Sequence, residues 1–562
     1  MKKLLTLTVL LTSFLSYSQS VYTQQTSDYN HFVDRYEILS GTINQNVHTS
    51  FKPYKRQDVV QMLTDSLFSD SSKILSKADY FNFEYIKDDN WDVYTGSGVS
   101  RIPVLKYFYK KKSALYAVDT KHFKLQANPV LYTWAGTETG NPNKVLFQNT
   151  RGVDLRGTID NKVSFYTQFT DNQARLPLYV YNSISPVDTL KQVLMGENYL
   201  KVDGKSHKLD YISARGYINF QATKHIAIQF GHDKNFVGNG FRSLILSENS
   251  GTYNFLKIQT KVWKLQYTNL FCQLTATPTV NDSYFAKKYL TLHHLSMNVT
   301  KFLNIGLFES VVYGGRGLDI NYLNPVIFYR SVEQNLGSSD NASLGADWKL
   351  NFMKHFSWYG QVYIDEFLIA NLKARNGSWT NKQAVQLGLK YMNVLGVKNL
   401  DGQLEFNSIR PYTYAHQDNG RNYSNYLQPL AHPRGANLKE VVGILKYQPT
   451  GRLFITGKFI VLKQGLDSLT STRSAGADIL MSYSQRIKHG NQDLNGHKIG
   501  QGVAVNLYMF TLGMSYMFRH NMFLDLNVQH RQQNSAVNAY KYDENFYSLG
   551  LRINIAEKKY DW

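Results

Sequence analysis

Hydrophobic and polar residues alternate one by one along much of the chain after about residue 121. The clearest run consists of Tyr547, Leu549, Leu551, Ile553 and Ile555, separated by Ser548, Gly550, Arg552 and Asn554. Period-two alternation places one set of side chains on each face of a β-strand. One face of this run suits lipid hydrocarbon, and the face that carries the arginine suits a watery interior. The run therefore predicts a strand of a membrane barrel.

The same alternation recurs upstream, at 163–169, 384–391 and 510–518, and turn pairs such as Asn376-Gly377 and Asp401-Gly402 punctuate it. About 440 residues follow position 121. At about 9–11 membrane residues per strand plus turns and outer loops, that length accommodates roughly 16–18 strands. We therefore predict an all-β fold, a transmembrane antiparallel β-barrel of roughly 16–18 strands over residues 122–562. An array of soluble β-sandwiches is the alternative.

The segment 19–121 has a different pattern. Residues 54–63 place apolar side chains at Val59, Val60, Met62 and Leu63 with polar residues between them, which predicts a helix. A second helix is expected within 71–83. We interpret 19–121 as a small helical or plug-like region that precedes the barrel.

The first eighteen residues resemble an export signal. Lys2 and Lys3 precede an apolar run that ends near Leu15, and Ser16 and Ser18 supply small residues at positions −3 and −1 of a cleavage site. We expect residues 1–18 to be a signal peptide. The apolar run is too short for a comfortable membrane span.

Composition supports an exported barrel. Aromatic residues make up 14% of the chain, including 40 Tyr and 31 Phe, and membrane barrels place such residues in girdles at both interfaces. Cys272 is the only cysteine, so no disulfide forms within the chain and multi-cysteine metal sites are excluded. A closed hydrogen-bond ladder would hold such a protein together.

The charge is uneven along the chain. The formal net charge is +20; residues 19–120 hold twelve basic and twelve acidic residues, and residues 121–562 hold 48 basic and 30 acidic ones. A basic exported region favours an anionic partner such as lipopolysaccharide phosphates or an acidic polysaccharide. The alternative is cationic decoration where strands meet lipid head groups. We expect no nucleic acid partner.

Signatures of enzymes are missing. The chain has neither a His-Glu-x-x-His zinc motif nor a Gly-x-Ser-x-Gly nucleophile elbow. His293-His294 has no third metal ligand placed beside it in the sequence. We therefore expect a non-enzymatic protein that needs no cofactor and no metal.

Four polar clusters are candidates for ligand contact. The richest is the glycine-rich run from Gly231 to Ser243; the others are 321–347, 360–367 and 407–440. Arginine and acidic groups near aromatic rings suit acidic sugars, but polar groups inside a barrel also pair with one another, because unpaired buried charges are costly. Both interpretations, polysaccharide binding and a lumen network, stay open. The candidate residues are Asp233, Lys234, Asn235, Arg242, Arg330, Asp365, Glu366, Arg410, Tyr412, His432 and Arg434.

The order of these clusters resembles the Wzi-type capsule assembly proteins of the outer membrane, in the form found in Bacteroidetes. The matching stretches are the run from Gly231, 322–325, 360–367, 410–414 and 432–437. The gliding motility protein RemB is similar to this family. The resemblance implies a barrel of about eighteen strands with helical material on the periplasmic side, and a lectin-like role in attaching capsular polysaccharide.

The expected function is therefore that of a cell-surface, outer-membrane barrel that binds or anchors surface polysaccharide. The alternatives are surface adhesion during gliding motility and a passive porin. Expected partners are surface polysaccharide, lipopolysaccharide and outer-membrane lipid, with gliding or secretion machinery as a further partner. The sequence does not identify the sugar.

Overall fold

The computed structural model describes residues 20–24, 28–66, 76–94, 98–100, 107–186, 192–276, 285–337, 340–366, 369–490 and 493–562. The predicted signal peptide lies outside these residues. Eighteen antiparallel strands close into a barrel, because the last strand pairs with the first along Phe546–Glu138 to Ile553–Leu131. The predicted fold class is thus confirmed, at the upper end of the expected strand number.

The barrel strands are β3 (Phe123–Glu138), β4 (Leu146–Ile159), β5 (Val163–Arg175), β9 (Lys208–Gln221), β10 (Ile226–Asp233), β12 (Tyr253–Val262), β13 (Leu265–Thr275), β14 (Lys287–Asn298), β15 (Leu303–Gly314), β16 (Asn341–Phe352), β17 (Phe356–Glu366), β18 (Lys382–Tyr391), β19 (Leu400–Ile409), β22 (Leu438–Thr450), β23 (Leu453–Leu466), β24 (Val503–Arg519), β25 (Met522–Ser535) and β26 (Tyr542–Ile553). Short strands are β1 (Phe51–Lys52), β2 (Tyr116–Asp119), β6 (Ser185–Pro186), β7 (Gln192–Val193), β8 (Tyr199–Asp203), β11 (Phe236–Val237), β20 (Ser424–Asn425) and β21 (Gln428–Pro429).

The helices are α2 (Asp28–Ser40), α3 (Arg56–Ser66), α4 (Lys77–Asp89), α5 (Leu178–Asn182), α6 (Tyr329–Leu336) and α7 (Ile369–Ala374), with 3-10 turns η1 (Ile320–Leu323), η2 (Val394–Gly396), η3 (Asn419–Arg421), η4 (Tyr483–Gln485) and η5 (Asn538–Tyr540).

The strand faces follow the alternation in the sequence. On β26, Tyr547 and Leu549 are 46% and 64% exposed on the outer wall. Arg552 points inward, where its guanidinium binds the Asp525 carboxylate at 2.8 Å. Outward apolar side chains can contact lipid while inward polar ones pair across the lumen.

The predicted alternation was wrong for one residue, Ile555. Ile555 does not continue the outer face, because β26 ends at Ile553 and Asn554 has a φ of +53°. A left-handed residue reverses the chain direction, and asparagine tolerates it better than most residues. Ile555 packs instead against a luminal aromatic cluster that includes Tyr132, Trp134 and Tyr179.

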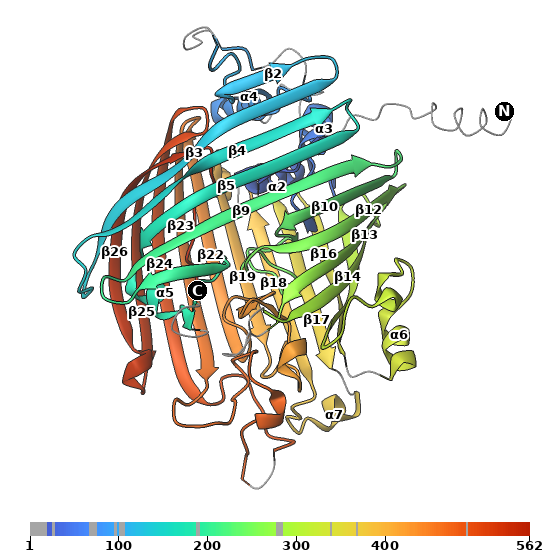
Figure 1. The fold of residues 1–562 in the computed structure, drawn as a ribbon, viewed down its shortest axis with the longest axis vertical. Helices are drawn as coiled ribbons and strands as arrows, with labels where there is room; N and C mark the ends of the chain where they lie inside the picture. The colour runs from blue at the N-terminus through green and yellow to red at the C-terminus, as the bar shows by residue number, and fades with distance from the viewer. Residues whose placement is uncertain are drawn as a thin grey trace, which may run out of the picture.

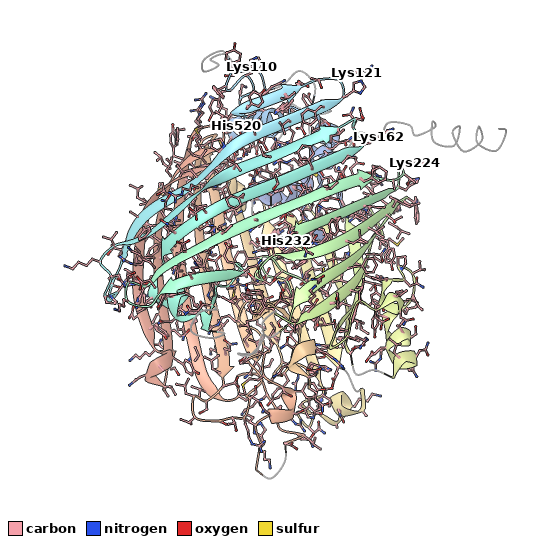
Figure 2. All side chains as sticks on the ribbon, in the orientation of Figure 1. Lys110, Lys121, Lys162, Lys224, His232 and His520 are labelled. Carbon is pink, nitrogen blue, oxygen red and sulfur yellow. The ribbon has the colours of Figure 1, made fainter. Side chains whose placement is uncertain are left out.

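The two ends of the barrel differ. At one end the strands are joined by short turns, such as 160–162, 263–264 and 520–521; at the other they are joined by long segments, such as 234–252, 315–340, 410–437 and 467–502. We call these the plug end and the loop end. Lys121, Lys162 and Lys224 lie at the plug end (Figure 2). If basic side chains contact lipid head groups, which is the alternative to an anionic partner given above, these three lysines would do so at this end.

The N-terminal helices α2–α4 gather inside the plug end (Figure 1). The helix predicted over 54–63 is α3. The second begins later than predicted, at Lys77, because Ser76 caps it: the Ser76 hydroxyl accepts from the Asp79 amide at 3.1 Å, and the Asp79 carboxylate accepts from the Ser76 amide at 2.9 Å. Residues 71–75 lie outside the described residues. We call residues 20–115 the plug.

The plug is continuous with the barrel at both of its margins. Just after it, β2 pairs with the start of β3 and extends the first hairpin. Within it, β1 pairs with β11, which belongs to the segment 234–252 that folds inward from the loop end. Around that small sheet lies a hydrophobic core in the lumen, to which Phe51, Leu244, Tyr363 and Tyr414 contribute. The barrel interior is therefore a packed core over much of its length.

Candidate functional site

Buried ion pairs attach the plug to the barrel wall. The Arg35 guanidinium contacts Asp79 of α4 at 3.0 Å and Asp401 of β19 at 2.6 Å. The Lys390 ammonium contacts Asp34 at 2.6 Å. Removing one partner of a buried pair leaves an uncompensated charge, which costs far more than the loss of an exposed pair. These contacts therefore hold the plug in one position.

Residues 554–562, which we call the tail, enter the lumen from the end of β26, and the C-terminus lies in the middle of the barrel (Figure 1). Asp561 forms an ion pair with Lys458 on β23, and its backbone carbonyl accepts from Arg242. Burial raises the pKa of Asp561, but Lys458 and Arg242 reverse this shift and lower it below the usual value. Trp562 packs into the luminal aromatic cluster.

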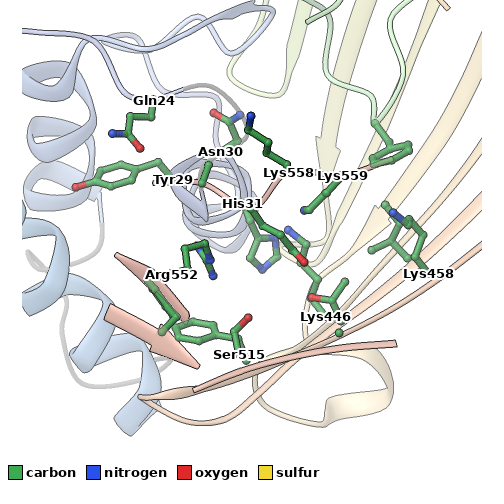
Figure 3. A pocket seen from close by; sticks show the side chains of 18 of the residues that line it. Gln24, Tyr29, Asn30, His31, Lys446, Lys458, Ser515, Arg552, Lys558 and Lys559 are labelled. Atoms are coloured by element: carbon green, nitrogen blue, oxygen red, sulfur yellow. The ribbon is translucent and has the colours of Figure 1, made fainter. Parts of the chain in front are cut away.

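A cavity of about 400 Å³ remains between the plug, the wall and the tail. More basic than acidic side chains line it, among them Lys446, Lys458, Lys558, Lys559 and Arg552 (Figure 3). Lys558 is already paired with Glu197 at 2.9 Å. The cavity is thus a polar, positively biased space whose charges are partly neutralised by neighbouring groups.

The glycine-rich run begins a segment that folds into the lumen, where its polar groups bind local partners. The Lys234 ammonium donates to the Gly196 carbonyl at 2.7 Å, and the Lys234 amide donates to Asp233 at 2.9 Å. The Asn235 amide donates to the Tyr253 hydroxyl at 3.1 Å. Burial lowers the pKa of Lys234 to about 8. These three predicted residues lie within the luminal packing.

Two distant predicted residues meet at a third group. The Glu440 carboxylate of β22 accepts from Arg242 at 2.9 Å and contacts His432 Nε2 at 2.9 Å, and all three side chains are buried. Burial lowers the pKa of His432, although Glu440 opposes the shift. Arg434 lies nearby and donates to Gln464 at 3.1 Å. The arrangement is a buried network.

Asp365 and Glu366 meet at Lys382. The Lys382 ammonium lies 3.3 Å from the Asp365 carboxylate and 3.2 Å from the Glu366 carboxylate. The register of β17 against β18 shifts between Ile364 and Glu366, and a bulge of this kind redirects a side chain. Asp365 is buried, whereas the Glu366 side chain is 40% exposed. Glu366 is therefore accessible at the loop end.

Arg410 and Tyr412 support the loops of the same end. Arg410 Nε donates to the Asn381 carbonyl at 2.7 Å, and the buried Tyr412 hydroxyl donates to the Ser474 carbonyl at 3.0 Å. Their polar groups bind main-chain partners. Arg330 is not with the others: it lies on α6, packed on the outside of β15 and β16, and its side chain is 75% exposed.

A cluster that was not predicted lies at the loop end, beside Glu366. The rings of Trp379 and Tyr483 are 4.7 Å apart, Arg486 lies 4.6 Å from the Trp379 ring, and Lys382 lies 4.7 Å from the Tyr483 ring. Trp379 and Tyr483 are half-buried. We call Glu366, Trp379, Lys382, Tyr483 and Arg486 the mouth cluster. Each ring has a cation over it, and these cation–π contacts help to hold the two rings in fixed positions.

Bonds to Asp493 and Leu494 also hold the mouth cluster in place. Arg486 Nε donates to the Asp493 carbonyl at 2.7 Å, and its Nη2 contacts the Asp493 carboxylate at 3.1 Å. The Trp379 amide donates to the Leu494 carbonyl at 3.1 Å. Aromatic faces combined with fixed charged groups can stack on a sugar ring and bind its hydroxyl or carboxylate groups.

In the described part of the chain, no three His, Cys, Asp or Glu side chains lie close enough together to hold a metal ion. His293 and His294 point to opposite faces of β14: His293 contacts Glu309 on the outer wall at 3.2 Å, and His294 contacts Asp347 inside at 2.6 Å. Among the described residues, no helix is both long and apolar enough to cross a membrane.

No protein-family model and no curated protein sequence matches the chain. Among solved structures, the chain is similar to Wzi of Escherichia coli, described as a carbohydrate-binding β-barrel of the outer membrane involved in group 1 capsule assembly. The identity is 13% and the TM-score 0.55, over 96% of this chain and 100% of that one. OprD of Pseudomonas aeruginosa matches with 11% identity and a TM-score of 0.41, over 76% of this chain and 94% of that one.

The fold is that of an outer-membrane β-barrel, in agreement with the predicted location. In barrels of this class the short turns face the periplasm and the long loops face the outside. The plug therefore lies at the periplasmic end, and the mouth cluster faces the cell exterior. The fold agrees with the part of the resemblance that concerns Wzi.

Proposed function

We propose that this protein binds surface polysaccharide at the mouth cluster and holds it at the cell surface without chemical turnover. The observation that carries the proposal is the pair of half-buried aromatic residues, Trp379 and Tyr483, fixed between Arg486 and Lys382 with the Glu366 carboxylate alongside. Rings of this kind stack on sugar faces, the guanidinium binds carboxylates, and the glutamate accepts from hydroxyls.

Of the predicted residues, Glu366 belongs to the contact surface in this proposal. Arg242, His432 and Arg434 have a supporting role: they belong to the buried network that holds the loop-end segments in place. Asp233, Lys234 and Asn235 are assigned the same supporting role. A polysaccharide is long, so it can lie across the mouth without entering the lumen.

A passive porin is the weaker candidate. Plug, inward-folded segment and tail occupy the lumen, and each is attached by buried contacts such as Arg35–Asp401 and Asp561–Lys458. An open diffusion channel needs a continuous watery path, and these elements lie across it. We expect low single-channel conductance from the intact protein.

Binding of purified bacterial polysaccharides, neutral and acidic, to detergent-solubilised protein at low salt tests the proposal. Each of Trp379→Ala and Tyr483→Ala should weaken binding by about 1–2 kcal/mol, or roughly 5- to 30-fold, because one stacking surface is lost. Trp263→Ala is the control, since Trp263 is 69% exposed at the periplasmic end. Equal binding by all variants, or no binding of any glycan, would contradict the proposal.

The biological setting is a further part of the proposal. We infer that the bound polymer is capsular, with adhesion during gliding as the alternative that the resemblance to RemB raises. A deletion strain complemented with wild type or with Trp379→Ala should be scored for capsule retention and for spreading on agar. Loss of capsule with normal spreading supports capsule attachment; the reverse result supports gliding.

A further inference from the structure

The loop between β15 and β16, residues 315–340, does not extend into solvent but lies against the outer wall of the barrel (Figure 1). We call it the wall loop; residues 338–339 lie outside the described residues. It contains η1 and α6, and α6 contacts both β15 and β16. The Tyr267 hydroxyl of β13 donates to the Pro325 carbonyl at 2.8 Å. Tyr267 lies near the periplasmic turn at 263–264, so the loop reaches far along the wall.

The wall loop covers polar groups that face outward from the strands. His293 and Glu309 share the outward face with Leu295 and Leu307, which are 37% and 57% exposed. The Tyr329 hydroxyl contacts His293 Nε2 at 2.5 Å, and the Tyr329 amide donates to Glu309 at 3.1 Å. Unpaired polar groups in the hydrocarbon region of a membrane are costly. The loop therefore satisfies groups that would otherwise face hydrocarbon.

A stack of tyrosines fixes the loop in place. The Tyr289 and Tyr313 rings of the wall are 5.3 Å apart, and Tyr313 and Tyr322 are 4.8 Å apart. The Tyr322 hydroxyl donates to the Asp340 carboxylate at 2.9 Å, and Arg316 pairs with Asp340 at 2.6 Å. Tyr313, Tyr322 and Tyr329 are almost fully buried. The wall loop is thus attached to the barrel wall through a packed interface.

The outer surface of the docked loop carries a group of exposed apolar side chains beside polar ones such as Arg330, whose side chain is 75% exposed. Ile320, Val326 and Phe328 are 81%, 79% and 77% exposed. The exposed apolar side chains continue the lipid-facing band of the neighbouring strands, to which the exposed Leu307 and Leu344 belong.

Between η1 and α6 the loop surface is hollowed. The hollow has a volume of about 480 Å³, and Ile320, Leu323, Ile327, Val332 and Leu336 supply its apolar lining, with asparagines as its polar members. A volume of this order accommodates a hydrocarbon chain, and an apolar lining inside a membrane excludes water from it.

We propose that the wall loop is a lipid-binding element: Val326 and Phe328 contact membrane hydrocarbon, and the hollow beside α6 holds one acyl chain. The loop then increases the lipid contact of the barrel on the side of β13–β16. This role is separate from sugar binding at the mouth cluster and does not depend on it.

Spin labels at single cysteines test the contact with hydrocarbon. In full-length protein with Cys272→Ala, labels are placed by Val326→Cys and Phe328→Cys, with Leu307→Cys as the lipid-facing control and Leu469→Cys as the aqueous control. Leu469 is 64% exposed in the loop after β23. The variants are reconstituted in vesicles of phosphatidylcholine and phosphatidylglycerol, and collisions with oxygen and with a water-soluble nickel complex are measured. Correct folding is checked by heat-modifiable gel mobility.

The expected result is that labels at 326 and 328 match Leu307→Cys, with nickel collisions several-fold below those of Leu469→Cys. Nickel accessibility equal to that of Leu469→Cys would overturn the proposal. Low accessibility to both reagents would also overturn it, because it would indicate a protein partner over the loop.

A second measurement addresses the hollow. Native mass spectrometry of the reconstituted protein should detect one fewer tightly held phospholipid in Leu323→Trp, which fills the hollow, than in wild type. Leu469→Trp, remote from the hollow, is the control and should retain the wild-type count. Equal lipid counts in wild type and Leu323→Trp would overturn the assignment of an acyl chain to this space.

Discussion

Arg35 joins three parts of the molecule, and its replacement tests how the plug is held. Its guanidinium contacts Asp79 on α4, Asp401 on β19 and the Asn393 side chain at 3.1 Å, and only 2% of its side chain is exposed. Arg35→Met keeps much of the side-chain volume but leaves two buried carboxylates without this partner. Breaking a buried pair in this way costs about 3–5 kcal/mol.

That cost should appear as faster local opening of the plug. Since about 1.4 kcal/mol changes an equilibrium tenfold, a loss of this size raises the open fraction by roughly 100- to 4,000-fold. Hydrogen exchange measured by mass spectrometry should show faster exchange in peptides covering α2 and α4, with β26 unchanged. The matched control is Glu84→Gln on α4, whose pair with Lys87 is 59% exposed at Glu84 and is worth about 0–1 kcal/mol.

Equal exchange of Arg35→Met and Glu84→Gln in the plug would contradict attachment of the plug through Arg35. Equal acceleration of exchange in the plug and in β26 by Arg35→Met would also contradict it, because the Arg35 ion pairs would then support the whole barrel and not the attachment of the plug.

Three further predictions concern the lumen. Deleting residues 556–562 should raise single-channel conductance above that of the intact protein; unchanged conductance would exclude the tail as an obstruction. Because the pKa of Asp561 is lowered in the folded state, its ion pair stabilises tail docking above the ordinary carboxyl pKa of about 4 and is lost as the pH falls below it. Conductance should therefore rise in acid, and Asp561→Asn should remove most of this dependence. Glu440→Gln leaves the Arg242 charge buried without its carboxylate, which should lower the free energy of unfolding by about 3–5 kcal/mol. The midpoint temperature of unfolding, followed by gel mobility, should therefore fall; an unchanged midpoint would contradict the buried network.

The barrel was predictable because its pattern is local. Alternation on β26 and β24 depends on neighbouring residues alone, and the exposed Leu549 and the inward Arg552 lie as expected. The turn at Asn554 was not predictable from alternation, since Ile555 extends the pattern for one more period. Whether a residue leaves the strand depends on its backbone conformation and on the luminal partners it then finds.

The mouth cluster was missed for a different reason. Trp379 and Tyr483 are about a hundred residues apart in two irregular loops, and no spacing in the sequence relates them. They meet because β18 and the long loop after β23 converge at one end of a closed barrel. Arg330 shows the converse: its neighbours in sequence resemble a luminal cluster, but the segment docks on the outer wall through Tyr322 and Tyr329.

The most direct test of the account is a hydrogen-exchange comparison of the protein with and without a bound polysaccharide. Exchange should be slower in peptides covering 376–381 and 482–487, where Trp379, Tyr483 and Arg486 lie, and unchanged in α2–α4. Protection that falls in the plug helices, or proven binding without protection at the mouth cluster, would contradict it.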